Sequence, residues 1–201
     1  MNTRTSGEYE TLSWSVDDDG VATLVLDRPE AMNSFTVTMA RELEQFFRTE
    51  AMRDEVKAVV VTGAGKAFCA GMDLSAEGNV FGLDETLSPS PADMRDRLDD
   101  PAIADGVRDT GGKVTLAIHE LPKPVIAAIN GAAVGIGATM TLAMDIRLAS
   151  TSARIGFVFG RLGIVPEATS SWFLPRIVGI QQALEWVYSA DILTADQALA
   201  G

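Results

Sequence analysis

The sequence has few of the residues on which several classes of function depend. It contains one cysteine, Cys69, and one histidine, His119, among 201 residues. A single cysteine rules out an intrachain disulfide and is typical of proteins of the reducing cytoplasm. A single histidine argues against histidine-based metal sites and catalytic triads. We therefore expect a cytoplasmic protein whose chemistry does not depend on either residue.

Positive charge and long apolar runs are also scarce. Sixteen Lys and Arg residues face 28 Asp and Glu residues, which gives a formal net charge of -12. This balance argues against a general binder of nucleic acid or membrane surfaces. No apolar run is long enough to span a membrane, and the polar start MNTRTSGEYE does not resemble a signal peptide. With 47% hydrophobic residues, the composition predicts one globular domain over residues 1–201.

The stretch Pro124–Ser150 is the most informative part of the chain. It predicts a buried strand at Val125–Ile129 and a glycine turn at Gly135 and Gly137. The first turns of a buried helix follow at Ala138–Met144, and a second strand at Ile146–Ala149. A strand that turns through glycines into a helix leaves free N–H groups at the helix start. Such groups hold an anion.

The glycine patterns narrow the choice of anion. The dinucleotide fingerprint fails because Met140 stands where its third glycine should be, and the phosphate loop fails because Ala67 follows Gly65-Lys66. A smaller target remains, such as a thioester oxygen that gains charge during a reaction. The alternative is that the glycines only let a helix pack tightly on a strand.

A second predicted strand, Lys57–Thr62, also runs into glycines. The segment Gly63–Leu74 leaves this strand through three glycines and ends near Asp73, which is a suitable N-cap for a helix. If the strands ending at Thr62 and Asn130 are neighbours, their glycine turns lie side by side. That edge of a sheet is where open α/β folds place ligands.

The other segments complete an α/β pattern. Glu77–Gly112 is predicted to be a long acidic loop, either a lid or disordered, with one short helix around Ala92–Leu98. Pro166 suits the first position of a helix that includes Glu167. The remaining predicted elements are a hairpin of Tyr9–Val16 and Val21–Leu26, a strand at Ala153–Phe159, and helices at Thr36–Thr49, Gly112–Leu121, Ile180–Tyr188 and Thr194–Ala200. We expect a repeated ββα-type spiral with helices outside the sheet.

Three motifs in this order closely resemble the enoyl-CoA hydratase/isomerase (crotonase) superfamily. They are R-P-x-x-x-N at Arg28–Asn33, A-F-C-A-G-M-D-L at Ala67–Leu74 and N-G-x-A-x-G-x-G at Asn130–Gly137. The resemblance implies the crotonase ββα spiral and acyl-CoA thioester substrates. It also implies no metal, no cofactor apart from the coenzyme A of the substrate, and a homotrimer or hexamer. Members of the family continue with a further helical segment, and this sequence ends before it, so that either the chain is a short form or only part of the protein is represented.

The resemblance also assigns roles to residues. It implies that the backbone N–H groups of Met72 and Ile136 form an oxyanion hole, as the glycine turns suggest. It implies a surface for the adenine and pantetheine of coenzyme A, with Lys66 and Arg28 as phosphate contacts. The predicted substrate-binding residues are Arg28, Ala31, Met32, Lys66, Ala70, Gly71, Asp73, Leu74 and Gly135.

Departures from the family pattern bear on the reaction. The two glutamates of family hydratases are replaced by Thr139 and Phe159. Instead, Pro166–Ser171 resembles the P-E-x-x-S-S segment of monofunctional 3-enoyl to 2-enoyl-CoA isomerases, in which the glutamate moves one proton between C2 and C4. This implies that Glu167 is the proton shuttle, since an isomerase adds no water and needs one base. Without the resemblance, Glu167 is interpreted as an ordinary glutamate in the first turn of a helix, where its negative charge interacts favourably with the helix dipole.

Two alternatives to the isomerase remain. One is hydration of 2-enoyl-CoA, with Glu167 and an acid of the loop, such as Asp84 or Glu85, positioning water. The other is a crotonase-fold binding protein that has lost catalysis. Thr139 and Phe159 favour the binding protein over the hydratase, and Glu167 in its motif favours the isomerase over both.

Overall fold

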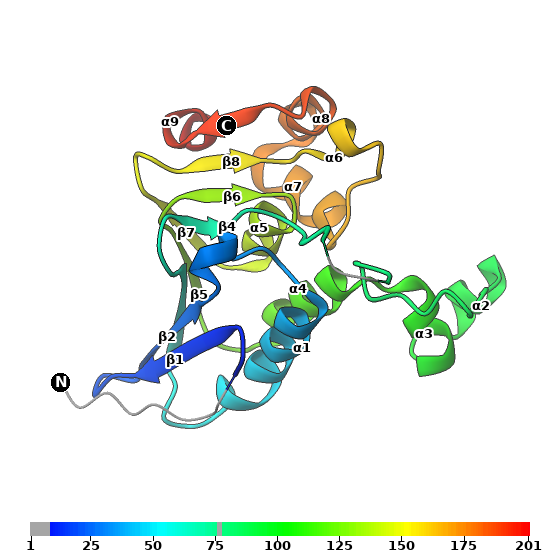
Figure 1. Ribbon diagram of the computed structural model, residues 1–201, viewed down its shortest axis with the longest axis horizontal. Coiled ribbons are helices and arrows are strands. Elements are labelled where there is room, and N and C mark those ends of the chain that lie inside the picture. Colours follow the sequence, from blue (N-terminus) through cyan, green and yellow to red (C-terminus); the bar gives the residue numbers. More distant parts are fainter. Residues whose placement is uncertain (1–8, 76–77) are drawn as a thin grey trace.

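The computed structural model describes residues 9–75 and 78–201, and it has the α/β architecture expected (Figure 1). The first sheet has the strand order β1-β2-β3-β5-β7, and the second has the order β4-β6-β8-β9. The strands of the first sheet are β1 (Leu12–Val16), β2 (Val21–Leu26), β3 (Ala58–Gly63), β5 (Val125–Ile129) and β7 (Ile146–Ala149). Those of the second are β4 (Ala67–Cys69), β6 (Ala132–Val134), β8 (Arg154–Gly156) and β9 (Ile192–Thr194).

The first sheet follows the sequence pattern closely. Strands β1 and β2 form the predicted antiparallel hairpin, and β2, β3, β5 and β7 run parallel to their neighbours. Strands β3 and β5 are adjacent, with Val59 opposite Val125, so the predicted pairing of these strands is confirmed. The parallel order places the chain leaving β3 and the chain leaving β5 at one edge of the sheet.

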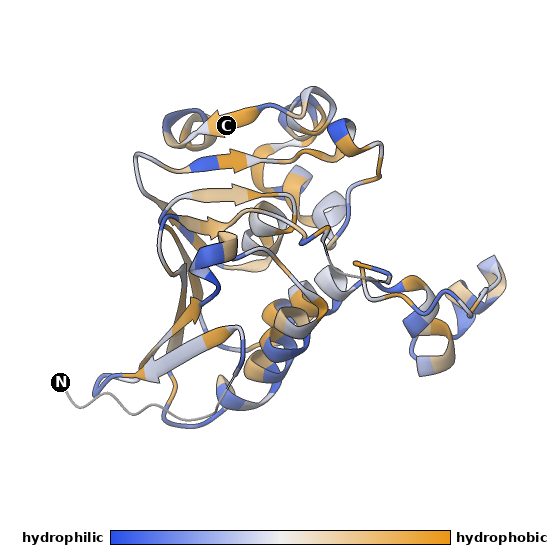
Figure 2. Cartoon of the chain, in the orientation of Figure 1, coloured by the Kyte–Doolittle hydropathy of each residue, from blue (hydrophilic) through white to orange (hydrophobic). Residues whose placement is uncertain are grey.

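Helices α1 (Val37–Gln45) and α4 (Thr110–Glu120) pack beside the first sheet (Figure 1). Helix α1 begins at Thr36, whose side chain accepts a hydrogen bond from Met39 N, and continues into the π-helix η2 (Phe46–Glu50). Phe46 of η2 joins the core against β1 through an edge contact with Trp14, at 5.4 Å between ring centres. Figure 2 shows polar and apolar residues on both helices, as expected of helices with one buried face.

In the second sheet only β8 lies within a predicted strand, Ala153–Phe159; β4, β6 and β9 were not predicted, because three-residue strands are too short to show a period of two. Strands β4 and β6 lie inside the two stretches that were interpreted as glycine turns. They pair in parallel, with Ala67 opposite Ala132. A Cβ on Gly137 would lie 2.1 Å from Cys69 O, and only glycine permits this approach. The two glycine turns therefore lie side by side, as expected, although short strands rather than turns join them.

Two predicted helix starts are wrong. Asp73 caps no helix: the described residues after it, Leu74 and Ser75, lie in a turn. Glu167 precedes helix α7 (Ser170–Val178) and is not part of it, because Ala168 and Thr169 have φ values of 50° and 57°. Left-handed residues cannot belong to a right-handed helix. A short helix, α6 (Phe159–Leu162), occupies the end of the predicted strand 153–159.

The helix at the second glycine turn begins earlier than predicted. Helix α5 (Ile136–Thr139) starts directly after Gly135, whose φ of 55° lets the chain turn sharply, and continues into the 3₁₀ helix η3 (Met140–Ala143). The predicted start was Ala138. Gly137 lies inside the helix, where it permits the contact with Cys69.

The acidic segment of residues 78–109 contains two helices rather than one. Helices α2 (Pro91–Asp96) and α3 (Pro101–Val107) each begin with a proline after a capping residue, Ser90 and Asp100. The two helices project from the body of the molecule (Figure 1). Glu77, the first residue of the predicted loop, lies outside the described residues, as does Ala76.

The C-terminal part of the chain covers the second sheet. Helices α8 (Ile180–Ser189) and α9 (Ala195–Ala200) match the predicted ranges closely, and α8 packs against α6 and α7. The remaining element is the 3₁₀ helix η1 (Pro29–Ala31) after β2. None of the helices in the described part of the chain is long and apolar enough to cross a membrane.

Candidate active site

A cavity of about 220 Å³ lies where the two glycine turns meet the segment before α7. It brings together Met72, Ile136 and Glu167, the three residues that the sequence proposed as the chemical centre. The remaining lining is Ala70, Gly71, Leu74, Phe81, Val134, Gly135, Val158, Phe159, Leu162 and Ile164. Most of this lining is apolar, so a charge that develops inside is poorly screened by water.

The backbone around Met72 directs its N–H away from the neighbouring strand. Met72 forms a parallel bridge with Phe35, in which Phe35 N donates to Gly71 O at 2.8 Å and Asp73 N donates to Phe35 O at 2.9 Å. In such a bridge the N–H of the central residue points to the opposite side. The Met72 N–H is therefore not used by this pairing.

The second N–H comes from the start of helix α5. Ile136 is the first residue of this helix, where a backbone N–H has no partner within the helix. The two turns touch, since a Cβ on Gly135 would lie 3.9 Å from Gly71 Cα. Two backbone donors from adjacent turns thus border one cavity. This arrangement can hold an oxygen that gains negative charge; the use of these two donors stays a prediction.

Glu167 is a partly buried acid that lines this cavity. Its Oε1 accepts a hydrogen bond from Thr139 Oγ1 at 3.0 Å, and its Oε2 is buried and without a hydrogen-bond partner. Burial first, and then the charge of Asp109, raise the pKa of Glu167, and the Thr139 hydrogen bond lowers it; together they give a pKa of about 7. A carboxyl group with this pKa both accepts and releases a proton near neutral pH.

The bend before α7 aims Glu167 at the cavity. The left-handed residues Ala168 and Thr169 turn the chain, and the backbone N and the Oγ of Ser170 both donate to Glu167 O, at 3.0 and 2.6 Å. Thr169 Oγ1 donates to Thr115 Oγ1 of α4 at 2.9 Å, which ties the bend to the core. The interpretation of Glu167 as a first-turn helical residue is therefore wrong.

The two positions that hold glutamates in hydratases both contact this site. Phe159 is buried and lines the cavity as an apolar wall. Thr139 is buried and donates the hydrogen bond to Glu167. Sequence reasoning treated Thr139 only as a missing acid and did not foresee its role as a donor, because that role depends on the fold of a segment 28 residues away.

Arg28 and Asp73 bind each other. Arg28 Nη1 lies 3.1 Å from Asp73 Oδ2 and donates to Ser34 O at 2.7 Å, so it joins the loop after β2 to the segment after β4. Hydrogen bonds, those from Ser75 first and then those from Arg28 and Ser34, lower the pKa of Asp73 to about 2. The pair holds this loop in place, and a contact of Arg28 with phosphate stays a prediction.

The other predicted binding residues lie around the same loop. Met32 O accepts a hydrogen bond from Ala70 N at 3.1 Å, while Lys66 is exposed and Leu74 is exposed at the border of the cavity. Ala31 ends the short helix η1. Of these residues, Ala70 and Leu74 line the cavity, and the use of any of them for coenzyme A stays a prediction.

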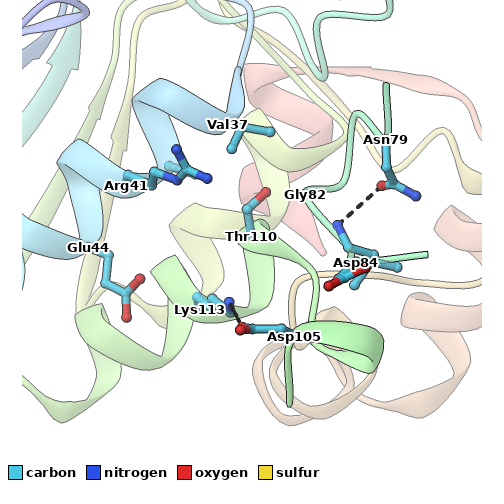
Figure 3. A pocket seen from close by; sticks show the side chains of 11 residues that line it. Val37, Arg41, Glu44, Asn79, Gly82, Asp84, Asp105, Thr110 and Lys113 are labelled. Atoms are coloured by element: carbon cyan, nitrogen blue, oxygen red, sulfur yellow. Dashed lines mark hydrogen bonds and ion pairs between the residues drawn. The ribbon is translucent and has the colours of Figure 1, made fainter. Parts of the chain in front are cut away.

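A larger cavity of about 580 Å³ is lined by Thr110 and Lys113 of α4, among others (Figure 3). It is lined by α1, α4 and the acidic segment, and it contains Asp84 and the ion pair of Lys113 with Asp105, at 2.8 Å. Glu85 accepts a hydrogen bond from Asn79. Asp84 and Glu85, the acids suggested for a hydratase, are thus absent from the lining of the smaller cavity, which contains Glu167 and is the better candidate site.

The residues described at 9–75 and 78–201 contain no cluster of three or more His, Cys, Asp or Glu side chains that could hold a metal ion. Cys69 is buried in β4, and burial raises the pKa of its thiol to about 12. A thiol with this pKa is a poor nucleophile near neutral pH.

Comparison with known proteins identifies the family. The sequence model of the family "Enoyl-CoA hydratase/isomerase" matches residues 17–201. The chain is 40% identical to "Enoyl-CoA hydratase ACTT3" of Alternaria alternata over 91% of this chain and 55% of that protein. It is 35% identical to "1,2-epoxyphenylacetyl-CoA isomerase" of Escherichia coli (strain K12) over 90% of this chain and 63% of that protein.

A solved structure supports the same assignment. A protein from Thermobifida fusca YX in complex with acetoacetyl-CoA shares 30% identity and a TM-score of 0.75, over 94% of this chain and 70% of that one. The chain thus spans 55% and 63% of the lengths of these two curated relatives. The chain belongs to the enoyl-CoA hydratase/isomerase (crotonase) family, and it has the crotonase-like fold of that family.

Proposed function

We propose that this chain carries the active site of an acyl-CoA isomerase that converts 3-enoyl-CoA to 2-enoyl-CoA. The observation that carries the proposal is the carboxyl group of Glu167, with its buried and unpartnered Oε2, in an apolar cavity that Met72 and Ile136 also line. One acid with a pKa of about 7 suits a reaction that takes up and returns the same proton.

The proposed reaction uses both oxygens of Glu167. Thr139 holds Oε1, and Oε2 takes a proton from C2 of the acyl chain. The electron pair of the C2–H bond moves onto the thioester oxygen, which the N–H groups of Met72 and Ile136 stabilise as an enolate. Glu167 then returns the proton to C4, and the double bond moves from C3–C4 to C2–C3. No water enters, so one carboxyl group is sufficient.

The substrate and the assembly are part of the same proposal. The surface formed by the Arg28 loop and the Ala70–Leu74 segment binds the coenzyme A portion, and no cofactor is needed apart from it. We expect the complete protein to act in the cytoplasm as a homotrimer or hexamer. The complex of a similar protein with acetoacetyl-CoA supports an acyl-CoA substrate.

Hydration of 2-enoyl-CoA is the alternative, because a relative at 40% identity is named a hydratase. Hydration needs a second acid or base to position water, and Thr139 and Phe159 stand where the resemblance places such groups. A crotonase-fold protein without catalysis is the third possibility. The presence of Glu167 in the lining of the cavity, with Oε2 buried and unpartnered, argues for catalysis.

Incubation of the protein with 3-hexenoyl-CoA and, in parallel, with 2-butenoyl-CoA separates the three possibilities. An isomerase converts 3-hexenoyl-CoA to the 2-enoyl product and does not hydrate 2-butenoyl-CoA. If 2-butenoyl-CoA is hydrated faster than 3-hexenoyl-CoA is isomerised, the proposal is contradicted and the protein is a hydratase. No conversion of either thioester, with binding of both, would favour the binding protein.

A further inference from the structure

Asp109 is an acid next to the candidate site that has no role in the proposal above. It lies directly before helix α4, and its Oδ1 accepts a hydrogen bond from Gly112 N at 2.6 Å. This bond caps the helix and fixes the orientation of the carboxylate. Asp109 is therefore held by the backbone.

Gly111 leaves the space between Asp109 and Glu167 open. A Cβ on Gly111 would lie 2.9 Å from Asp109 Oδ1 and 3.0 Å from Glu167 Oε2, so the two oxygens are less than about 6 Å apart. The same Cβ would lie 2.7 Å from Cδ1 of Ile136. The unpartnered oxygen of Glu167 thus faces a carboxylate across a gap bordered by an apolar side chain.

Few other groups act on the Glu167 carboxyl. Thr139 donates to Oε1, and the thiol of Cys69 lies close enough for the charge of Glu167 to influence it. The thiol is neutral near pH 7, because burial raises its pKa to about 12. In the described part of the chain no Lys, Arg or His forms an ion pair with Glu167. Asp109 is therefore the charged group to which Glu167 responds.

We propose that Asp109 is a positioning residue of the proton shuttle, whose fixed negative charge favours the protonated form of Glu167. The inference rests on the proposed function, in which Glu167 moves the proton. When the C2–H bond breaks and the O–H bond forms at Oε2, Glu167 loses its negative charge, and the repulsion from Asp109 is relieved. Asp109 thus makes Glu167 a stronger base toward C2, whereas the Thr139 hydrogen bond, which favours the carboxylate, has the opposite effect.

Titration of the Glu167 carboxyl carbon by ¹³C NMR tests this without any need for catalysis, with Glu167→Gln identifying the signal. Asp109→Asn and Asp109→Ser remove the charge and keep a side chain that caps helices. We expect both variants to lower the pKa of Glu167 by about half to one unit. Thr139→Val removes a donor to the carboxylate and should raise the pKa, and Thr139→Ser should restore it.

Asp105→Asn is the matched control. It removes a negative charge from the same segment, but Asp105 binds Lys113 at 2.8 Å and lies in the other cavity. The titration of Glu167 should therefore stay unchanged in this variant. An equal shift in Asp105→Asn and Asp109→Asn, or no shift in either Asp109 variant, would overturn the role of Asp109.

The pH dependence of isomerisation is the second measurement. Glu167 must be deprotonated to accept the C2 proton, so the acid limb of the rate profile should move to lower pH in Asp109→Asn and to higher pH in Thr139→Val. A structural defect would lower both rates without moving the limbs in opposite directions. If Glu167→Gln still isomerises, the proposed function fails, whereas the NMR titration still decides whether Asp109 acts on Glu167.

Discussion

The paired strands β4 and β6 and the acidic segment of residues 78–109 differ in what holds them. At the paired strands, backbone atoms touch backbone atoms: a Cβ on Gly131 would lie 2.0 Å from Lys66 O, and one on Gly137 would lie 2.1 Å from Cys69 O. In the acidic segment, side chains cap helices and pair on the surface, as Ser90 and Asp93 do at α2.

This difference explains where the chemistry lies. Backbone contacts leave no freedom of rotamer, so N–H groups at the ends of β4 and β6 keep a fixed geometry at little cost of ordering. Surface caps and exposed ion pairs each contribute about 1 kcal/mol or less, and they allow a segment to change. We infer that the strand ends fix the reacting oxygen, and that the acidic segment adjusts to the substrate.

The largest effect is expected at the carboxyl group that faces the strand ends. Glu167→Gln keeps the size and removes the base, so isomerisation and exchange of the C2 proton should fall by about a hundredfold or more. Binding of a non-reactive acyl-CoA should change little. The control is Asp96→Asn in α2, an exposed acid paired with Arg95, which should leave the rate unchanged. A Glu167→Gln protein that keeps more than about a tenth of the wild-type rate would contradict the assignment.

The second effect tests the backbone donor at the end of β4. Met72→Pro removes an N–H group and should lower the rate by about a hundredfold to a thousandfold. Met72→Ala keeps the N–H and should stay within about tenfold of the wild type. Circular dichroism and binding of a non-reactive acyl-CoA establish that both variants fold. Equal rates for Met72→Pro and the wild type would remove Met72 from the site.

The same contrast decides what the sequence could predict. The long strands and helices have apolar residues at regular spacing, and β5 and β7 have the predicted bounds. The motifs pointed to the three residues that now line one cavity, Met72, Ile136 and Glu167. Spacing along the chain is sufficient for such features, because each depends on local sequence or on a family pattern.

Features that depend on tertiary contacts could not be predicted. The start of α7 was misplaced, because the left-handed conformation of Ala168 and Thr169 leaves no mark in residue type. Thr139, which donates a hydrogen bond to Glu167, lies 28 positions away in the sequence, and Asp109, which lies close to Glu167 in space, is 58 positions away. The Asp-x-x-Gly pattern before α4 could have indicated a capping residue, but nothing in it indicates the neighbouring acid.

The smallest effect is expected in the acidic segment. It tests whether this segment, unlike the ends of β4 and β6, changes when substrate binds. Phe81 is the residue of this segment that lines the smaller cavity, and its O accepts a hydrogen bond from Thr110 N of α4 at 2.9 Å. If the segment adjusts to the substrate, amide hydrogen exchange at residues 79–84 should slow severalfold when a non-reactive acyl-CoA binds. Helix α2, which projects away from the body, is the internal control and should exchange at an unchanged rate (Figure 1). Identical exchange at residues 79–84 with and without ligand would show that this segment is not a lid, and the site would then depend on the strand ends alone.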